Sequence, residues 1–578
     1  MGCDDQPGNR IPDLATFSSQ IARRLQVIYK ADFTEGMVNR ILGMTTRQFE
    51  ARSLWDEKDV VLITYGNSLH KPGEKPLRTL HRFMHNRLAD IINCVHILPF
   101  FPSTSDDGFS VSDFRAVNPA FGDWEDIAVI SKEFDLMADL VINHVSVSHQ
   151  WFSNYLADRN PGRNFFIEPE PDFDYSQVIR PRSTPLFTRF ETVRGVREVW
   201  TTFSADQVDL NFSNPDVLIE MIGVLLLYLS KGARIVRLDA IAFLWKTRDT
   251  SCLHRPETHE IVKLLRDIVS FVSPGTLILT ETNVPNRENW SYFGNGDEAH
   301  MVYQFALPPL LLHALHTGNS KYLNEWALEI PATPANQTFL NYTASHDGIG
   351  IRPLEGLLPE KEITQLIDGM MNFGGRVSNK VNRDGSLSPY EINITYPDAM
   401  KGDKNGADDF QEARFICSQT IMMSLQGIPA FYINSLVGTA NDDEGVAATG
   451  KARSINRRQW LEDELLQRLS SDTIHHRLFH EITRLIGIRR QCPAFHPGCP
   501  QKILIAGDCL FAFERFNAST GDRIVCISNI SNQTVETDAG PLQMQKGYDL
   551  ISGETMSGKS DRILLKAYQT KWIVTGKA

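Results

Sequence analysis

The sequence predicts a closed (β/α)8 barrel that carries two inserted loop domains and ends in an antiparallel β-domain. Two observations predict the barrel: short strands that are apolar on both faces, and helical stretches between them. Strands of this kind, alternating with helices, are typical of parallel sheets. Eight of them favour a closed barrel. An open doubly wound sheet is disfavoured because no G-x-G-x-x-G motif follows the first strand.

Residues 1–54 are expected to form a helical extension, because Ile21, Leu25 and Ile28 recur at helix spacing without strand-like alternation. The barrel is assigned to three stretches of the chain that follow this extension. They are residues 55–145, 214–347 and 413–495. The eight expected strands are 60–66, 94–101, 136–145, 233–241, 275–283, 300–307, 337–347 and 427–435.

Two connections are far longer than ordinary ones, which run to about 2–6 residues. The first insert, 146–213, follows the third strand, and the second, 348–412, follows the seventh. Long insertions after barrel strands lie at the catalytic face, so both are expected to shape a substrate pocket. Residues 496–578 change to short alternating strands with turn residues between them, which predicts the C-terminal antiparallel β-domain.

The composition narrows the range of partners. The formal net charge is −12, from 58 basic and 70 acidic residues, and it disfavours nucleic acid and anionic membranes. An anionic substrate would therefore need a local cluster of Arg or Lys. The eight cysteines are sparse and form no C-x-x-C pair, which indicates reduced, structural thiols. No secretory segment, nucleotide motif or membrane-length apolar run occurs, so a cytoplasmic protein without a cofactor is expected.

Polar residues collect where four of the expected strands end, and these ends meet in one pocket of a barrel. Arg237 and Asp239 are two residues apart on a strand and therefore face the same way. An arginine beside a carboxylate is expected to keep its pKa low, as a nucleophile requires. A lone Asp at a strand end more often caps a loop, but three acids, two histidines and an arginine together predict a catalytic site. These six residues are His144, Arg237, Asp239, Glu281, His346 and Asp347, and Asp139 and Asn143 also lie at the end of the third strand.

Four segments resemble the signature segments of the α-amylase superfamily of retaining glycosidases and transglycosidases, in the family's order. They are DLVINH (139–144), GARIVRLDA (232–240), ILTETN (278–283) and TASHD (343–347). The resemblance implies that Asp239 is the nucleophile, Glu281 the general acid/base and Asp347 the transition-state stabiliser. It also places His144, Arg237 and His346 around the bound glucosyl unit. Retaining chemistry of this kind needs two carboxyl groups about 5–5.5 Å apart.

Further segments resemble the sucrose phosphorylase branch of that superfamily. They are SDDGFSVSDF (105–114), RPRSTPLFT (180–188), VWTTFSADQVDLNF (199–212) and SINRR (454–458). This resemblance implies that Asp106 and Arg457 bind glucose, that Phe109 lies against its ring, that Gln207 lies near the nucleophile and that Arg182 meets phosphate. The branch transfers glucose to phosphate through a glucosyl-enzyme, giving α-glucose 1-phosphate, and typically lacks the calcium ion of amylases. No metal and no cofactor are therefore expected.

The helical extension and three further motifs resemble the glucosylglycerate phosphorylases of the branch. The motifs are WKTRDTSCLH (245–254), SHDGIG (345–350) and SPYEINITY (388–396). The expected reactants are thus a glucoside donor, phosphate and a glycerate or sugar acceptor. Sucrose stays open as the donor, and so do two further hypotheses, a starch hydrolase and a non-catalytic amylase-like subunit. A glycerate carboxylate needs a cation, for which the candidates are Arg182, Arg189, Arg194, Arg197, Lys451, Arg453 and Arg458. The sequence leaves the oligomeric state open.

Overall fold

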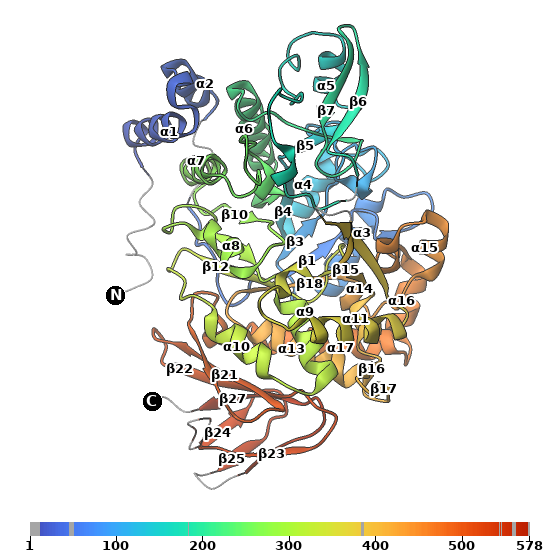
Figure 1. The fold of residues 1–578 in the computed structure, drawn as a ribbon. Helices are drawn as coiled ribbons and strands as arrows, with labels where there is room; N and C mark the ends of the chain where they lie inside the picture. The colour runs from blue at the N-terminus through green and yellow to red at the C-terminus, as the bar shows by residue number, and fades with distance from the viewer. Residues whose placement is uncertain are drawn as a thin grey trace.

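The computed structural model describes residues 12–575 except 46–50, 183, 383–385, 541, 543, 545 and 558–561. The N-terminal residues in which a secretory segment would be sought lie outside this range. Eight parallel strands close into a barrel, which confirms the predicted fold class (Figure 1). In order round the barrel they are β1 (Val61–Thr64), β3 (Cys94–Ile97), β4 (Asp135–Val141), β9 (Ala233–Asp239), β10 (Leu277–Thr280), β11 (Met301–Tyr303), β12 (Thr338–Tyr342) and β18 (Ile428–Tyr432).

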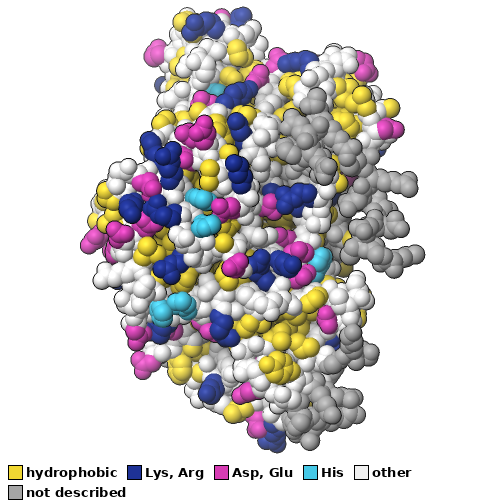
Figure 2. Space-filling model, turned by 180° about the vertical axis from the view of Figure 1, so that it is seen from behind, with side chains coloured by type: hydrophobic (Ala, Val, Ile, Leu, Met, Phe, Trp, Pro, Cys, Tyr) yellow, Lys and Arg dark blue, Asp and Glu magenta, His cyan; other side chains and the backbone are white. Residues whose placement is uncertain are grey.

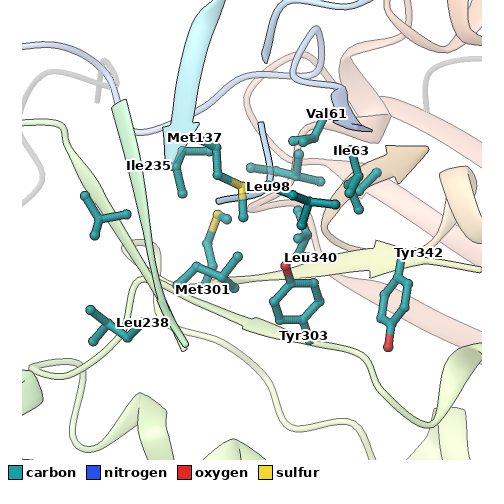
Figure 3. Close-up of a cluster of buried hydrophobic side chains, with 14 of the residues drawn as sticks. Val61, Ile63, Leu98, Met137, Ile235, Leu238, Met301, Tyr303, Leu340 and Tyr342 are labelled. Carbon is teal, nitrogen blue, oxygen red and sulfur yellow. The ribbon is translucent and has the colours of Figure 1, made fainter. Parts of the chain in front are cut away.

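Apolar side chains fill the inside of the barrel (Figure 3). Val61, Ile63, Met137, Ile235 and Leu340 all belong to this cluster, and each is at most 3% exposed. Because side chains alternate along a strand, each strand contributes residues both to this interior and to the layer beneath the helices. The interior is therefore a packed core, and a substrate can bind only at one of its ends.

Helices cover the outside of the barrel. The α6 helix (Pro215–Ser230) is mostly apolar and contacts β4, β9 and the N-terminal helix α2 (Glu35–Met44). The longer helices of this layer are α3 (Pro76–Leu88), α4 (Trp124–Glu133), α6 (Pro215–Ser230), α7 (Pro256–Val272), α9 (Leu307–Thr317), α10 (Lys321–Glu329), α13 (Gln411–Ser424), α16 (Glu462–Ser470) and α17 (Ile474–Arg489). Shorter helices α8 (Asn286–Trp290), α14 (Ile433–Leu436) and α15 (Asp443–Thr449) lie in the loops between them.

The N-terminal extension is a pair of helices, α1 (Leu14–Tyr29) and α2 (Glu35–Met44), that packs on α7 and α6 (Figure 1). Phe17 stacks on Phe271 of α7 with 4.0 Å between ring centroids. Arg24, itself buried, pairs with Asp267 of α7 at 3.0 Å. The extension therefore joins the barrel through both apolar and charged contacts.

The first insert contains α5 (Gln150–Leu156) and a hairpin of β6 (Phe187–Thr192) with β7 (Gly195–Trp200), and a short antiparallel pair joins it to the barrel. That pair is β5 (His144–Ser146) with β8 (Gln207–Asp209). The expected strand 136–145 was wrong at its end, since β4 stops at Val141 and His144 begins β5. The reason is that β5 leaves the barrel to pair with a strand of the insert.

The second insert holds α11 (Glu360–Asn372) and a three-stranded sheet in the order β13 (Ile349–Gly350), β15 (Leu387–Asn393), β14 (Arg376–Val381). After this sheet, and still within the insert, come α12 (Tyr396–Ala399) and the small hairpin of β16 (Gly402–Asp403) with β17 (Gly406–Ala407). Near the barrel mouth, β2 (Leu69–His70) pairs with β19 (Trp460–Leu461). Loops far apart in the sequence thus meet at one end of the barrel.

The C-terminal strands form a six-stranded antiparallel sheet in the order β20 (Gln501–Leu504), β21 (Leu510–Asn517), β22 (Asp522–Asn529), β27 (Thr570–Thr575), β24 (Lys546–Asp549), β25 (Thr555–Ser557). A second pair, β23 (Val535–Asp538) with β26 (Arg562–Leu565), completes this part of the chain. The sheet packs on α13, where the buried Arg515 donates to the Ser424 carbonyl at 2.9 Å.

On the face of the molecule opposite to the view of Figure 1, acidic and basic side chains are intermixed among apolar ones (Figure 2). Across the described residues, no helix is both long enough and apolar enough to cross a membrane.

Candidate active site

Three carboxyl groups line one cavity at the carboxyl ends of the barrel strands. Asp239 is the last residue of β9, Glu281 follows β10 directly, and Asp347 lies in the loop after β12. Strands of a parallel barrel all end at the same rim, which is why residues more than a hundred positions apart meet there. The cavity lies between the two inserts, with walls from the loops after β3, β4 and β18.

A buried arginine holds Asp239 in place. The Arg237 Nη1 donates to Asp239 Oδ1 at 2.8 Å and also to the carboxylate of Asp139. Asp139 lies opposite Arg237 in the β4–β9 ladder, and His96 Nε2 is 2.7 Å from its other oxygen. The two-residue spacing of Arg237 and Asp239 therefore puts both side chains on one face, as the sequence predicts.

The pKa of Asp239 is not low in this cavity, contrary to the expectation. Burial raises it well above the usual value, and the Arg237 guanidinium offsets this only in part. Besides burial, the charges of Glu281 and Asp139 raise this pKa further, and Arg237 also contacts Asp139. Burial alone would raise the pKa of Asp139, but His96 and Arg237 together lower it to about 2. One guanidinium is thus shared between two carboxylates, and the charge of Asp139 adds to the electrostatic cost of ionising Asp239.

Glu281 has the properties expected of an acid. Burial raises its pKa, with Arg237 opposing the shift. The Ala240 amide donates to Glu281 Oε2 at 3.0 Å, which fixes this oxygen beside the residue that follows Asp239. Ala240 has φ 50° and ψ 29°, a left-handed conformation that costs energy for a residue with a Cβ. The sharp turn after β9 therefore orients the amide toward the second carboxyl group.

Asp347 is held in the ionised form by two arginines from the loop after β18. Arg453 is 2.5 Å from Asp347 Oδ1, and Arg457 is 3.7 Å from the same atom. Burial would raise the pKa of Asp347, but Arg453, His346 and Arg457 lower it well below its usual range. Arg453 also binds Glu391 of β15, with 3.0 Å between Nε and Oε2. This arginine therefore connects the last barrel loop, the second insert and the site.

A polar and aromatic wall faces these carboxyl groups. Gln207 Nε2 donates to Asp106 Oδ2 at 3.1 Å and lies 3.1 Å from His144 Nε2. Phe109 stacks on His346 with ring centroids 4.9 Å apart. All five side chains line the cavity. A flat ring next to a row of hydrogen-bonding groups has the form of a site for one sugar ring.

The loop that supplies Asp106 is tightly folded. Asp106 and Asp107 have φ values of 51° and 49°, and Gly108 has φ 114°. A Cβ on Gly108 would lie 2.6 Å from the Pro99 carbonyl oxygen, so only glycine fits. The D-D-G sequence therefore fixes the direction of the Asp106 side chain. Burial would raise the pKa of Asp106, but Arg182, Arg453 and Arg457 lower it.

Ten of the eleven expected site residues line the cavity, and Arg457 is the exception. It lies behind the wall, where it pairs with Asp107 and donates to the His346 carbonyl oxygen at 2.8 Å. Its charge is therefore used within the protein. The ten residues that line the cavity are Asp106, Phe109, His144, Arg182, Gln207, Arg237, Asp239, Glu281, His346 and Asp347.

Five of the expected acceptor cations lie away from the cavity lining. Arg189 pairs with Glu198 on the β6–β7 hairpin, and Arg458 pairs with Glu464. The others in this group are Arg194, Arg197 and Lys451. Arg182 and Arg453 do line the cavity.

Sequence reasoning missed several further residues of the lining, and four of them have polar side chains that bear on substrate binding. These four are Asn283, Arg352, Tyr390 and Glu391. Asn283 and Tyr390 lie inside segments quoted above for their resemblance, and Arg352 follows the SHDGIG segment by two positions. Their position in or next to a motif was therefore the one feature of the sequence that could have identified them as site residues. No local pattern identifies them, because pairing of β13 with β15 brings two of these segments together.

Within the described residues, no group of three or more His, Cys, Asp or Glu could hold a metal ion. A buried ammonium lies where the first insert meets the barrel. Lys246 Nζ is 2.7 Å from Asp209 Oδ2 and 3.0 Å from Asn143 Oδ1, and it donates to the Phe243 carbonyl oxygen. Three oxygen atoms from three segments therefore surround one lysine.

Comparison with known proteins agrees with this geometry. The family profile described as "Alpha amylase, catalytic domain" matches residues 89–347. The glucosylglycerate phosphorylase of Escherichia coli (strain K12) is 43% identical over 565 residues, covering 96% of this chain and 99% of that protein. The sucrose phosphorylase of Streptococcus mutans serotype c is 29% identical over 453 residues, covering 75% and 88%.

Among solved structures, the sucrose 6F-phosphate phosphorylase of Thermoanaerobacter thermosaccharolyticum superposes with a TM-score of 0.72. The two chains are 24% identical, with 88% of this chain and 98% of that chain covered, so this likeness describes the fold. The barrel and its carboxyl groups thus define an enzyme site of the α-amylase type. The chain belongs to the α-amylase superfamily, within its branch of glycoside phosphorylases.

Proposed function

We propose that the protein is a retaining α-glucoside phosphorylase that converts glucosylglycerate and phosphate into α-D-glucose 1-phosphate and glycerate. The observation that carries the proposal is the cavity itself, which is lined by the carboxyl pair of Asp239 and Glu281 and by arginines able to receive anions. The similarity to a glucosylglycerate phosphorylase along almost the whole chain supports the choice of donor.

The first half-reaction needs one ionised and one protonated carboxyl group. Burial raises the pKa of both Asp239 and Glu281. Asp239 has the guanidinium contact at 2.8 Å, which favours its ionised form against the effect of burial, so in the proposed reaction Asp239 holds the negative charge and Glu281 takes the proton. Asp239 then attacks C1 of the glucosyl unit while Glu281 protonates the departing oxygen. The bond from C1 to glycerate breaks, and a covalent glucosyl-enzyme forms with Glu281 ionised.

The second half-reaction reverses these roles. A phosphate hydroxyl attacks C1, the bond to Asp239 breaks, and the Glu281 carboxylate takes the phosphate proton. This restores both groups to their starting state. Asp347, kept ionised by Arg453 and Arg457, would bind glucose hydroxyls and favour the positive charge that develops on the sugar ring.

Phosphate must enter a cavity that already holds several carboxylates, so it needs a cation. Arg182 from the first insert is our candidate. It lines the cavity, and its guanidinium lies 5.8 Å from the ring centre of Tyr390. Among the described residues it has no ion pair within 4.0 Å, so its hydrogen-bond donors are available to phosphate.

The test is incubation with phosphate and a panel of glucosides, with release of glucose 1-phosphate as the readout. The panel contains glucosylglycerate, sucrose, glucosylglycerol and maltose. Glucosylglycerate should give the highest kcat/KM. A clear preference for sucrose would move the assignment to sucrose phosphorylase, the activity named for the 29% identical relative. Release of free glucose at the same rate with and without phosphate would instead indicate a hydrolase.

A further inference from the structure

We propose that Arg352 binds the carboxylate of the acceptor, and so selects glycerate over neutral acceptors. This inference rests on the proposed function, whose donor and acceptor it explains. Arg352 lies just after β13, in the loop that follows Asp347, and it lines the same cavity as the three carboxyl groups.

The cavity arginines differ in how far their charges are already used. Arg237 contacts Asp139 and Asp239, and its contact with Asp239 is 2.8 Å long. Arg453 contacts Asp347 at 2.5 Å and also Glu391. These two guanidinium groups each contact two carboxylates of the protein, which leaves little binding capacity for a substrate anion.

Arg352 has a weaker ion pair within the protein than Arg237 and Arg453 have. Its one carboxylate neighbour among the described residues is Glu288, whose Oε2 is 3.7 Å from Arg352 Nη2. The side chain of Glu288 is 43% exposed, whereas that of Arg352 is 17% exposed. A pair at this distance and exposure is weak. The Arg352 guanidinium therefore retains the planar set of N–H donors that binds a carboxylate through two parallel hydrogen bonds.

Arg352 lies on the side of the cavity where the proposed function places the leaving group. A Cβ on Gly350 would lie 2.8 Å from the Asn283 side chain, so the strand before Arg352 runs directly against the segment after Glu281. Glu288, the neighbour of Arg352, belongs to α8 at the end of that segment. Arg352 is thus attached to the acid's side of the cavity, while Arg457 is attached to Asp107 on the other wall.

The chemistry of glycerate requires a cation at this side. The departing oxygen receives its proton from Glu281, so the acceptor must lie next to that residue. Both hydroxyl groups of glycerate are on the two carbons nearest its carboxylate, so the anion stays close to the transferred oxygen. The two available arginines, Arg182 and Arg352, then match the two anions of the reaction, with phosphate assigned to the first and the acceptor to the second.

The experiment compares acceptors in the reverse reaction, in which glucose 1-phosphate donates and phosphate release is measured. For Arg352→Gln, kcat/KM for glycerate should fall about ten- to a hundredfold, the range for loss of a charge-assisted hydrogen bond. The kcat/KM for glycerol should change less than about twofold, because glycerol has no carboxylate to lose a partner. Arg352→Lys should recover part of the glycerate activity. Arg458→Gln, which removes an arginine outside the cavity lining, is the matched control and should leave both values unchanged.

An equal loss on glycerate and glycerol would overturn the inference, because it would mean that Arg352 only shapes the loop. A wild-type enzyme that does not use glycerate would show instead that the proposed function is wrong. In that case, the role of Arg352 in carboxylate binding is tested separately. Propionate, a carboxylate without a hydroxyl group, is added as an inhibitor of the reaction with glycerol. Weaker inhibition of Arg352→Gln than of wild type supports carboxylate binding, and equal inhibition overturns it.

Discussion

Asp239 and Glu281 are both carboxylic acids that line one cavity, and single contacts separate their proposed roles. Asp239 has the Arg237 guanidinium, whereas Glu281 has one backbone amide. We predict that Asp239→Asn removes nearly all turnover with every donor, because no covalent bond can form. Glu281→Gln should lose nearly all turnover with glucosylglycerate but retain reaction with glucosyl fluoride, whose leaving group needs no proton. Initial rates with both donors check this, and an equal loss on both would contradict the assigned roles.

The pH dependence follows from the raised pKa of Glu281. Burial favours the protonated form, so the acid stays protonated to a higher pH than an exposed glutamate would. The kcat/KM for glucosylglycerate should fall as the pH rises through this pKa, because the proton donor is lost. The fluoride donor should lack that alkaline limb, since kcat/KM for a donor reports only the first half-reaction. The same alkaline limb with both donors would assign it to another group.

At the residue scale, the sequence predicted what depends on local spacing. Arg237 and Asp239 share a face because strand side chains alternate, and the carboxyl groups meet because parallel strands end at one rim. The pKa of Asp239 could not be predicted in this way. It depends first on burial and then on the charges of Glu281 and Asp139, and Asp139, about a hundred positions away, shares Arg237 through the β4–β9 pairing.

Among the elements, the first insert is joined to the barrel by the pair β5–β8 and by Lys246. The Lys246 and Asp209 side chains are 7% and 0% exposed. Removing one partner of a buried ion pair leaves the other charge without compensation and typically costs about 3–5 kcal/mol. We predict that Lys246→Met lowers stability by an amount in this range. It should also weaken donor binding, because β5 and β8 carry His144 and Gln207 into the cavity.

Thermal unfolding and the donor KM measure the two effects of Lys246→Met. The matched control is Arg248→Met, two positions away on an exposed side chain that is 4.0 Å from Glu170, and it should change stability by less than about 0.5 kcal/mol. Equal stability of the two variants would show that the ammonium is not needed to join the insert to the barrel.

Some boundaries and positions of elements could not be predicted from sequence patterns. Strand and helix periodicity predicted the barrel, because each strand is buried on both faces by neighbours of the same kind. It could not predict that β4 ends at Val141 and that β5 turns away, because the partner of β5 lies across the whole first insert. The same holds for Arg352, whose place in the cavity depends on the pairing of β13 with β15, about forty positions further on.

For the whole molecule, one continuous apolar core joins the N-terminal helices, the barrel and part of the C-terminal sheet. It extends from Phe17 in α1 through the barrel to Trp572 in β27. We therefore expect the N-terminal helices to unfold together with the barrel, whereas the C-terminal sheet also has a second apolar cluster of its own. Removing the Phe17 side chain should therefore lower the stability of the whole enzyme, although Phe17 is not part of the site that the carboxyl groups line.

We predict that Phe17→Ala destabilises the protein by about 3–5 kcal/mol, the usual cost of removing a buried phenylalanine side chain. Phe17 is 0% exposed and stacks on Phe271 of α7. Unfolding should remain a single transition at a lower midpoint, with activity lost at the same temperature as secondary structure, because α7 connects β9, which ends at Asp239, to β10, which precedes Glu281. Val27→Ala on the same helix, where the side chain is 48% exposed, is the control and should change the midpoint little. Calorimetry together with residual activity after heating measures this. A separate low-temperature transition that leaves activity intact would mean that α1 and α2 unfold on their own, and that the core divides at the α1–α7 contact.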